Sequence, residues 1–221
     1  MKILIPWSIL LLQLGGCSGN SDHSKLKITN GREPAAGEYS SVVVVDTAFE
    51  DGEGARCSGT FITRNQILTS AHCVVSEKTG KPGSASYVNI ESDKVIKIAE
   101  AVRVEANPKF EFGSAVHDLA VVSFAEPIAP SSSAIAQETP KLGTKVTLVG
   151  YGHNTVTVDE EGEIQSETGA GVKRIGNGTF IDFDAKDGVI LLTGVLAPNP
   201  SIPDFEGKSA AIASGDSGGP L

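Results

Sequence analysis

The chain has 221 residues and a formal net charge of −9. This length suffices for one large hydrophobic core or two smaller ones. The excess of negative charge argues against a nucleic-acid partner and favours solubility, without identifying a function.

The first 16 residues have the plan of a signal peptide. Lys2 precedes an apolar run, residues 3–14, that is shorter than the ~20 residues needed to cross a bilayer. The run ends in Leu14-Gly15-Gly16-Cys17, which resembles the bacterial lipobox. We therefore expect export, removal of residues 1–16 and lipidation of Cys17, which would anchor the protein at the membrane, periplasmic or on the cell surface. An ordinary secretory signal cleaved nearby is the alternative.

Residues 17–27 are short and polar and end at a basic residue, Lys27, which predicts a tether or propeptide. Two acidic segments, residues 50–53 and 159–163, lack the regular ligand spacing of a calcium loop. We interpret them as solvated turns and expect neither a metal nor a cofactor.

From residue 40 onward the chain is typical of β-structure. Short apolar or β-branched runs alternate with Gly, Pro, Asn and Asp. The expected strands are residues 42–45, 60–63, 66–69, 94–104, 119–124, 145–150, 179–181 and 189–192. Many short strands at this spacing predict an all-β sandwich or barrel protein.

A stretch rich in Ala, Pro and Ser, residues 125–140, interrupts the strands. We interpret it as a linker between two β units of ordinary domain size, residues 28–128 and residues 129–221.

Three separated segments carry candidate chemistry. Ser217 is flanked by glycines, an arrangement that opens the approach to a nucleophilic hydroxyl and turns backbone amides toward a substrate. His72 ends one apolar strand and Asp118 precedes another. Each has a plain alternative: a glycine-rich loop, a strand-end histidine and a strand cap. Because only four residues follow Ser217, a base and an acid must come from upstream, which excludes the α/β-hydrolase order.

Together these segments resemble the chymotrypsin-like, trypsin-fold serine proteases. The family's three sequence boxes match Thr69-Ser70-Ala71-His72-Cys73, Asp118-Leu119-Ala120-Val121-Val122 and Gly215-Asp216-Ser217-Gly218-Gly219-Pro220. They occur in the family's order, 46 residues apart (118 − 72) and 99 residues apart (217 − 118). Residues 146–152 are similar to the family's first strand of the second barrel. The resemblance runs from Ile28 to Leu221 and implies two antiparallel Greek-key β-barrels.

The resemblance also implies roles for these residues. Ser217 would attack a peptide carbonyl, His72 would take and return the proton, and Asp118 would orient the imidazole. The amides of Gly215 and Ser217 would form the oxyanion hole. The expected substrate is a protein or peptide.

Cys57 and Cys73 match the disulfide that clamps the family's histidine loop. Lipidation of Cys17 would leave these two as the remaining pair, outside the cytoplasm, where a disulfide persists.

Activation and specificity follow from the same resemblance. Cleavage after Lys27 would free the amine of Ile28 to pair with Asp216. The base of the specificity pocket falls at Ala211, followed by Ile212, so we expect an uncharged, apolar P1 side chain. A lysine would not suit that pocket, which implies that a separate trypsin-like protease activates the protein.

Family members continue past the nucleophile, and this sequence ends at Leu221. We therefore expect the second barrel to be incomplete at its C-terminus. Two hypotheses follow: a secreted serine endopeptidase, or a catalytically inactive relic or binding module.

Overall fold

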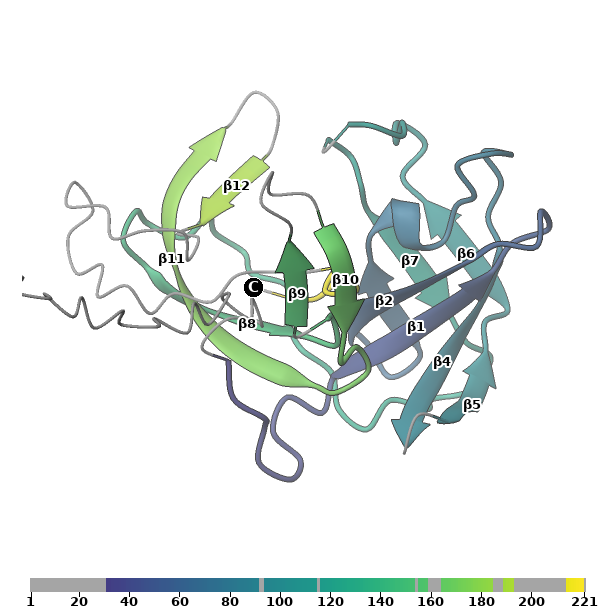
Figure 1. Ribbon diagram of the computed structural model, residues 1–221, viewed down its shortest axis with the longest axis horizontal. Helices are drawn as coiled ribbons and strands as arrows, with labels where there is room; N and C mark the ends of the chain where they lie inside the picture. Colours follow the sequence, from purple (N-terminus) through teal and green to yellow (C-terminus); the bar gives the residue numbers. More distant parts are fainter. Residues whose placement is uncertain are drawn as a thin grey trace, which may run out of the picture.

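The computed structural model describes residues 31–91, 94–114, 116–153, 155–158, 164–184, 189–192 and 214–220. These residues form an all-β protein with two regions (Figure 1). The first region holds β1 (Val42–Ala48), β2 (Gly54–Phe61), β3 (Gln66–Thr69), the 3-10 helix η1 (Ala71–Cys73), β4 (Ser84–Glu91), β5 (Lys94–Glu100), β6 (Arg103–Ala106) and β7 (Ala120–Ser123). The second holds β8 (Lys145–Gly150), β9 (Thr155–Val158), β10 (Ile164–Thr168), β11 (Arg174–Asp184) and β12 (Val189–Leu192).

The first region is one antiparallel sheet that curls on itself. Its strand order is β5-β4-β1-β2-β3-β7-β6. The link between the two edge strands hydrogen-bonds to two other strands: Ala101 N donates to Ala85 O of β4 and Val102 N donates to Ser123 O of β7, both at 2.9 Å. Because one short link joins strands near both edges, the sheet bends toward closure.

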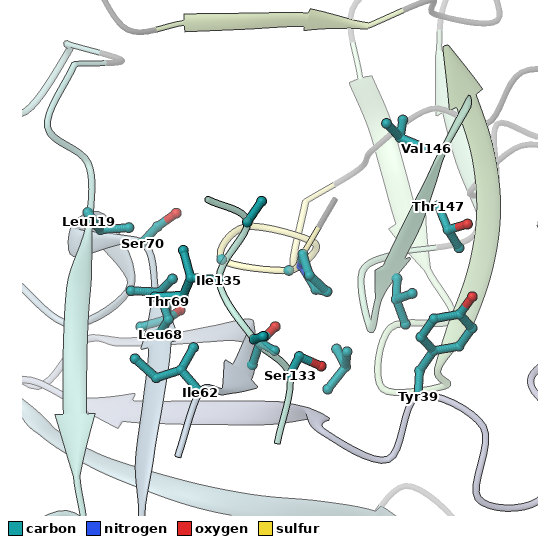
Figure 2. Close-up of a pocket in the computed structure, with 18 of the residues that line it drawn as sticks. Tyr39, Ile62, Leu68, Thr69, Ser70, Leu119, Ser133, Ile135, Val146 and Thr147 are labelled. Carbon is teal, nitrogen blue, oxygen red and sulfur yellow. The ribbon is translucent and has the colours of Figure 1, made fainter. Parts of the chain in front are cut away.

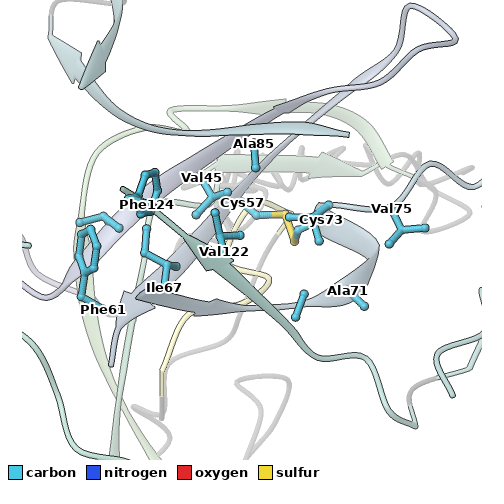
Figure 3. Close-up of a cluster of buried hydrophobic side chains, with 13 residues drawn as sticks. Val45, Cys57, Phe61, Ile67, Ala71, Cys73, Val75, Ala85, Val122 and Phe124 are labelled. Atoms are coloured by element: carbon cyan, nitrogen blue, oxygen red, sulfur yellow. A yellow bond between two sulfur atoms is a disulfide. The ribbon is translucent and has the colours of Figure 1, made fainter. Parts of the chain in front are cut away.

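β1 is buried on both faces. Its run of four valines has exposed fractions of 3% or less, which explains why it reads as continuously apolar rather than alternating. Val43 and Val45 enter the main core, whereas Val42 packs with Val149 of β8 and Ile175 of β11. This strand therefore joins the two regions. The main core, part of which Figure 3 shows, is composed of Val43, Val45, Cys57, Phe61, Ile67, Ala71, Cys73, Val74, Val75, Ala85, Ala120, Val122 and Phe124.

Within the described part of the chain, the second region has fewer strands than the first. β8 pairs antiparallel with β11, from Lys145 opposite Thr179 to Gly150 opposite Arg174, and β12 pairs with the far part of β11. β9 and β10 form a separate two-stranded sheet. Near the start of the described chain, Arg32 forms an antiparallel bridge with Ile175 of β11. The N-terminal segment is thus attached to the second region before the chain enters the first.

The predicted linker, residues 125–140, contains no strand. It lies against the first sheet, because Ala129 N donates to Arg64 O at 2.9 Å and Ser133 N donates to Phe61 O at 2.8 Å. The placement of a domain boundary here stays a prediction.

Five predicted strands occur close to their expected positions, as β1, β3, β7, β8 and β12. Others differ in extent: residues 60–63 overlap only the end of the longer β2, residues 179–181 are the middle of β11, and residues 94–104 divide into β5 and β6. β4, β9 and β10 were not expected. Among the described residues, no helix is long and apolar enough to span a bilayer.

Candidate active site

His72 is presented to solvent by a short helix whose other residues are buried. In η1, Ala71 and Cys73 have exposed fractions of 0% and 1%, whereas the His72 side chain is 40% exposed. Cys73 is bonded to Cys57 of β2 across 16 residues of sequence, with 6.0 Å between the Cα atoms. The predicted disulfide is confirmed, and it fixes the backbone next to His72 to the core.

Asp118 contacts His72 twice. Its Oδ1 accepts a hydrogen bond from His72 N at 2.9 Å, and its Oδ2 lies 2.6 Å from His72 Nδ1. A carboxylate only accepts, so the proton of the second bond belongs to Nδ1 and the neutral ring carries its lone pair on Nε2. The arrangement orients an imidazole whose outer nitrogen can take a proton.

The Ser217 segment is held against β2. Ser58 N donates to Ser217 O at 2.9 Å, and Ser58 Oγ donates to Gly215 O at 2.9 Å. The same hydroxyl accepts from Tyr151 N at 2.9 Å, which connects the segment to the end of β8. Ser58 directly follows the disulfide residue Cys57, so one stretch of β2 positions both the His72 loop and the Ser217 loop.

Glycine is required at the residue after Ser217. Gly218 has a φ of 78°, and a Cβ there would collide with Thr69 Oγ1 and Ser58 O. Thr69 ends β3, and η1 begins two residues later. The Ser217 loop therefore packs against the chain that leads into His72, a close approach that only glycine permits.

Asp216 points the other way, toward β8. Its exposed fraction is 8%, and its Oδ1 accepts from Gly152 N at 2.8 Å. A Cβ at either Gly150 or Gly152 would collide with this carboxylate. These two glycines make room for a buried acid between β8 and the Ser217 loop.

Several predicted site residues lie outside the described residues. They are Cys17, Lys27, Ile28, Ala211 and Ile212. The structure describes His72, Cys57, Cys73, Asp118, Gly215, Asp216 and Ser217, and brings them together around β2 and the end of β8.

Sequence reasoning missed Ser58. No motif surrounds it, and its function depends on Gly215 and Tyr151, which lie 157 and 93 residues away in sequence. The one feature of the sequence that could have indicated a role for Ser58 is its position directly after Cys57.

Cys57, His72 and Cys73 place their potential ligand atoms within 4.8 Å of one another. Both sulfur atoms are bonded to each other, and metal ligation by cysteine requires the thiolate. The group as it stands does not offer a metal site.

A cavity of about 840 Å³ lies beside this site, between the two regions. Figure 2 shows Ile62, Leu68 and Thr69 on one side and Val146 and Thr147 on the other. Its lining includes neither His72 nor Ser217. The cavity is therefore separate from these two residues.

A family model described as Trypsin matches residues 28–221. The chain belongs to the trypsin family. The match to the trypsin family includes His72, Asp118 and Ser217 and begins after Cys17 and Lys27.

Relatives of the chain are trypsin-like serine endopeptidases. Human Kallikrein-7 is 28% identical over 158 residues, and Trypsin of Saccharopolyspora erythraea is 21% identical over 169 residues. These alignments cover 70% and 75% of this chain, and 59% and 69% of the relatives. Rat Chymotrypsin-C is 23% identical over 127 residues, 56% of this chain and 47% of that protein. The chain thus spans about half to two thirds of the length of these relatives.

Among solved structures, the chain resembles one titled "Structure of GrC". The TM-score is 0.59 at 15% sequence identity, covering 86% of this chain and 82% of the other. This likeness supports the trypsin fold.

Proposed function

We propose that the protein is an exported serine endopeptidase in which Ser217, His72 and Asp118 form the catalytic triad. The observation that carries the proposal is the pair of hydrogen bonds that His72 donates to the Asp118 carboxylate, from its backbone N at 2.9 Å and from Nδ1 at 2.6 Å. A histidine held in this way has Nε2 as its only free base.

In the proposed mechanism, Ser217 Oγ attacks the carbonyl carbon of the scissile peptide while Nε2 of His72 takes the hydroxyl proton. The amides of Gly215 and Ser217 stabilise the negative charge on the carbonyl oxygen. The C–N bond then breaks, and the leaving amine takes the proton from Nε2. A water molecule, deprotonated by His72, hydrolyses the acyl-enzyme and regenerates Ser217.

Peptide hydrolysis tests this function. We expect Ser217→Ala to lower kcat by several orders of magnitude with KM little changed, because the substrate is still bound when the nucleophile is absent. Ser214→Ala is the matched control: its side chain is exposed in the same loop, and its backbone carbonyl, which accepts from His153 N at 2.8 Å, is retained. Undiminished hydrolysis by Ser217→Ala would contradict the assignment of the nucleophile. No hydrolysis by the unaltered protein would favour the binding module.

The specificity proposal rests on sequence. Ala211 and Ile212 carry no charge, so we propose a preference for uncharged, apolar P1 side chains. A panel of peptides that differ only at P1 would test it. Faster cleavage after Lys or Arg than after Leu or Phe would contradict it.

We further propose that cleavage after Lys27 activates the protein. The new amine of Ile28 would pair with Asp216, a buried carboxylate that accepts a hydrogen bond from Gly152 N. Support comes from the bridge between Arg32 and Ile175, which attaches the segment four residues after Ile28 to the region that holds Asp216.

The same cut would release the protein from its lipid anchor at Cys17, because Cys57 and Cys73 are bonded to each other. A trace of trypsin, acting as the activating protease, should convert membrane-bound protein to a soluble species beginning at Ile28. An Ile28 species that stayed in the membrane fraction would contradict the coupling of activation to release.

A further inference from the structure

His117 has an unusual backbone conformation directly before Asp118. Its φ is 64°, and the other non-glycine residue with a positive φ among the described residues is Tyr39, at 48°. This left-handed region is unfavourable for residues with a Cβ, although His, Asn and Asp tolerate it better than most. Strained residues of this kind gather at functional sites, where the surrounding structure holds them.

The left-handed residue begins a tight turn around Asp118. Leu119 N donates to His117 O at 2.8 Å, which closes a three-residue turn with Asp118 at its centre. Downstream, Leu119 O accepts from Asn107 N at 2.8 Å, and β7 follows from Ala120. The backbone of Asp118 is therefore fixed on one side by a strand and on the other by the conformation of His117.

The contact between Asp118 and His72, which this turn supports, requires one orientation of the carboxylate. Asp118 presents Oδ1 to His72 N and Oδ2 to His72 Nδ1 at the same time, at 2.9 and 2.6 Å. A carboxylate accepts hydrogen bonds close to its own plane, so both bonds form only when the edge that carries the two oxygen atoms points at His72. A turn of the preceding backbone would move both oxygen atoms together.

We propose that His117 is a positioning residue, whose left-handed backbone, and not its imidazole, directs the Asp118 carboxylate at His72. The His117 side chain is exposed, so it is free to be exchanged. The proposal deepens the proposed function and rests on it where it concerns catalysis.

Substitutions of His117 distinguish the effect of its backbone conformation from the effect of its imidazole ring. Gly and Asn adopt the left-handed region readily, Ala less so, and Val very poorly. We expect His117→Gly and His117→Asn to behave like the unaltered protein, His117→Ala to be intermediate and His117→Val to be most impaired. His117→Ala keeps the test informative if His117→Val fails to fold.

Two measurements report the effect: an NMR signal of the full chain, and peptide hydrolysis by the chain cleaved after Lys27. The proton between His72 Nδ1 and Asp118 Oδ2 lies in a short, charge-assisted hydrogen bond and should give a proton NMR signal far downfield of the amides. We expect the Ala variant to weaken this signal and the Val variant to lose it. In peptide hydrolysis, kcat of the Val variant should fall by up to about 100-fold with KM little changed, as for a small misplacement of a catalytic group.

Tyr39→Val is the matched control for strain alone. It places the same poor residue at the other non-glycine position with a positive φ, which lies across the cavity from Leu119, the neighbour of Asp118 (Figure 2). We expect it to lower the unfolding midpoint while the downfield signal remains. Retention of the signal and of kcat in the Val and Ala variants would overturn the proposal. So would loss of the signal in the Asn and Gly variants, because it would assign the effect to the ring. The NMR signal is read without turnover, so its result stands even if the protein hydrolyses no peptide.

Discussion

Among the described residues, the two regions of the molecule differ in their buried clusters and in what they contribute to the candidate site. The first sheet has seven strands, the larger buried cluster and the disulfide, and it carries both His72 and Asp118. The sheet of the second region that packs on β1 has three strands, and its small cluster of Val149 and Ile175 is completed by Val42 of the first. His72 and Asp118 are thus held by one region, whereas the Ser217 loop is positioned by contacts between regions.

Two phenylalanines test the difference in packing. Phe61 of the first sheet and Phe180 of β11 have exposed fractions of 0% and 2%. Phe61 also meets the rings of Tyr87 and Phe124, with centroids 5.5 and 6.1 Å away. Replacing a buried Phe by Ala costs about 3–5 kcal/mol, and aromatic pairs add to the loss. We expect Phe61→Ala to be near the top of this range and Phe180→Ala near the bottom, measured by denaturant unfolding. An equal or larger loss for Phe180→Ala would contradict the comparison.

Removal of the disulfide should cause the next largest loss of unfolding free energy. Closing a loop of 16 residues stabilises a protein by about 3 kcal/mol in the chain-entropy treatment. We expect the double variant Cys57→Ala/Cys73→Ala to lose about that much free energy of unfolding. Non-reducing mass spectrometry should first show the linked peptide in the unaltered protein. Two free thiols in the folded, exported protein would contradict the pairing.

Ser58→Ala tests the contact between regions. The buried hydroxyl bonds Gly215 O and Tyr151 N, and its removal leaves both groups without that partner. Such a loss costs about 1–3 kcal/mol. Thr60→Val, on the same strand, is the matched control, because the Thr60 hydroxyl is buried without a partner and its removal should cost little. Similar losses of unfolding free energy in the two variants would show that Ser58 is not the connection described here.

The strands and site residues that could be predicted from the sequence are those that depend on neighbouring residues. Runs of β-branched residues predicted β1, β3 and β8, and compact motifs predicted His72, Asp118 and Ser217. β4 was missed because its sequence, SASYVNIE, mixes polar and apolar residues. It is a strand because β1 and β5 pair with it on either side. Strand formation of this kind depends on partners distant in sequence.

Two backbone features could not be predicted, because they too depend on residues distant in sequence. The left-handed φ of His117 leaves no mark in the sequence, since histidine occurs in every backbone region. The bend that divides residues 94–104 into β5 and β6 arises from bonds at Ala101 and Val102 to two different strands. Neither feature follows from the local pattern of side chains.

The smallest predicted effect on stability concerns an ion pair in the segment that leads into β1. Arg32 Nη1 and Nη2 donate to the two carboxylate oxygens of Glu38 at 2.7 and 2.6 Å, which lowers the pKa of Glu38 to about 2 from its ordinary value of 4.5. Because the folded pKa is depressed, the stabilisation is complete above pH 4.5 and is lost as the pH falls toward 2. An NMR titration should show this low value, and Arg32→Met should return it toward 4.5. An unchanged pKa in Arg32→Met would contradict the pairing. The pair is exposed, so we expect little change in overall stability.

In the proposed function, Ser217 is a nucleophile activated by a histidine that Asp118 orients. A peptidyl organophosphonate, which reacts covalently with an activated serine, tests it most directly when the labelled residue is mapped by mass spectrometry. In the protein cleaved after Lys27, we predict one label per chain, on Ser217, abolished in Ser217→Ala, strongly slowed in His72→Ala and retained in Ser214→Ala. A label on another residue, or uptake that continues in Ser217→Ala, would contradict the account.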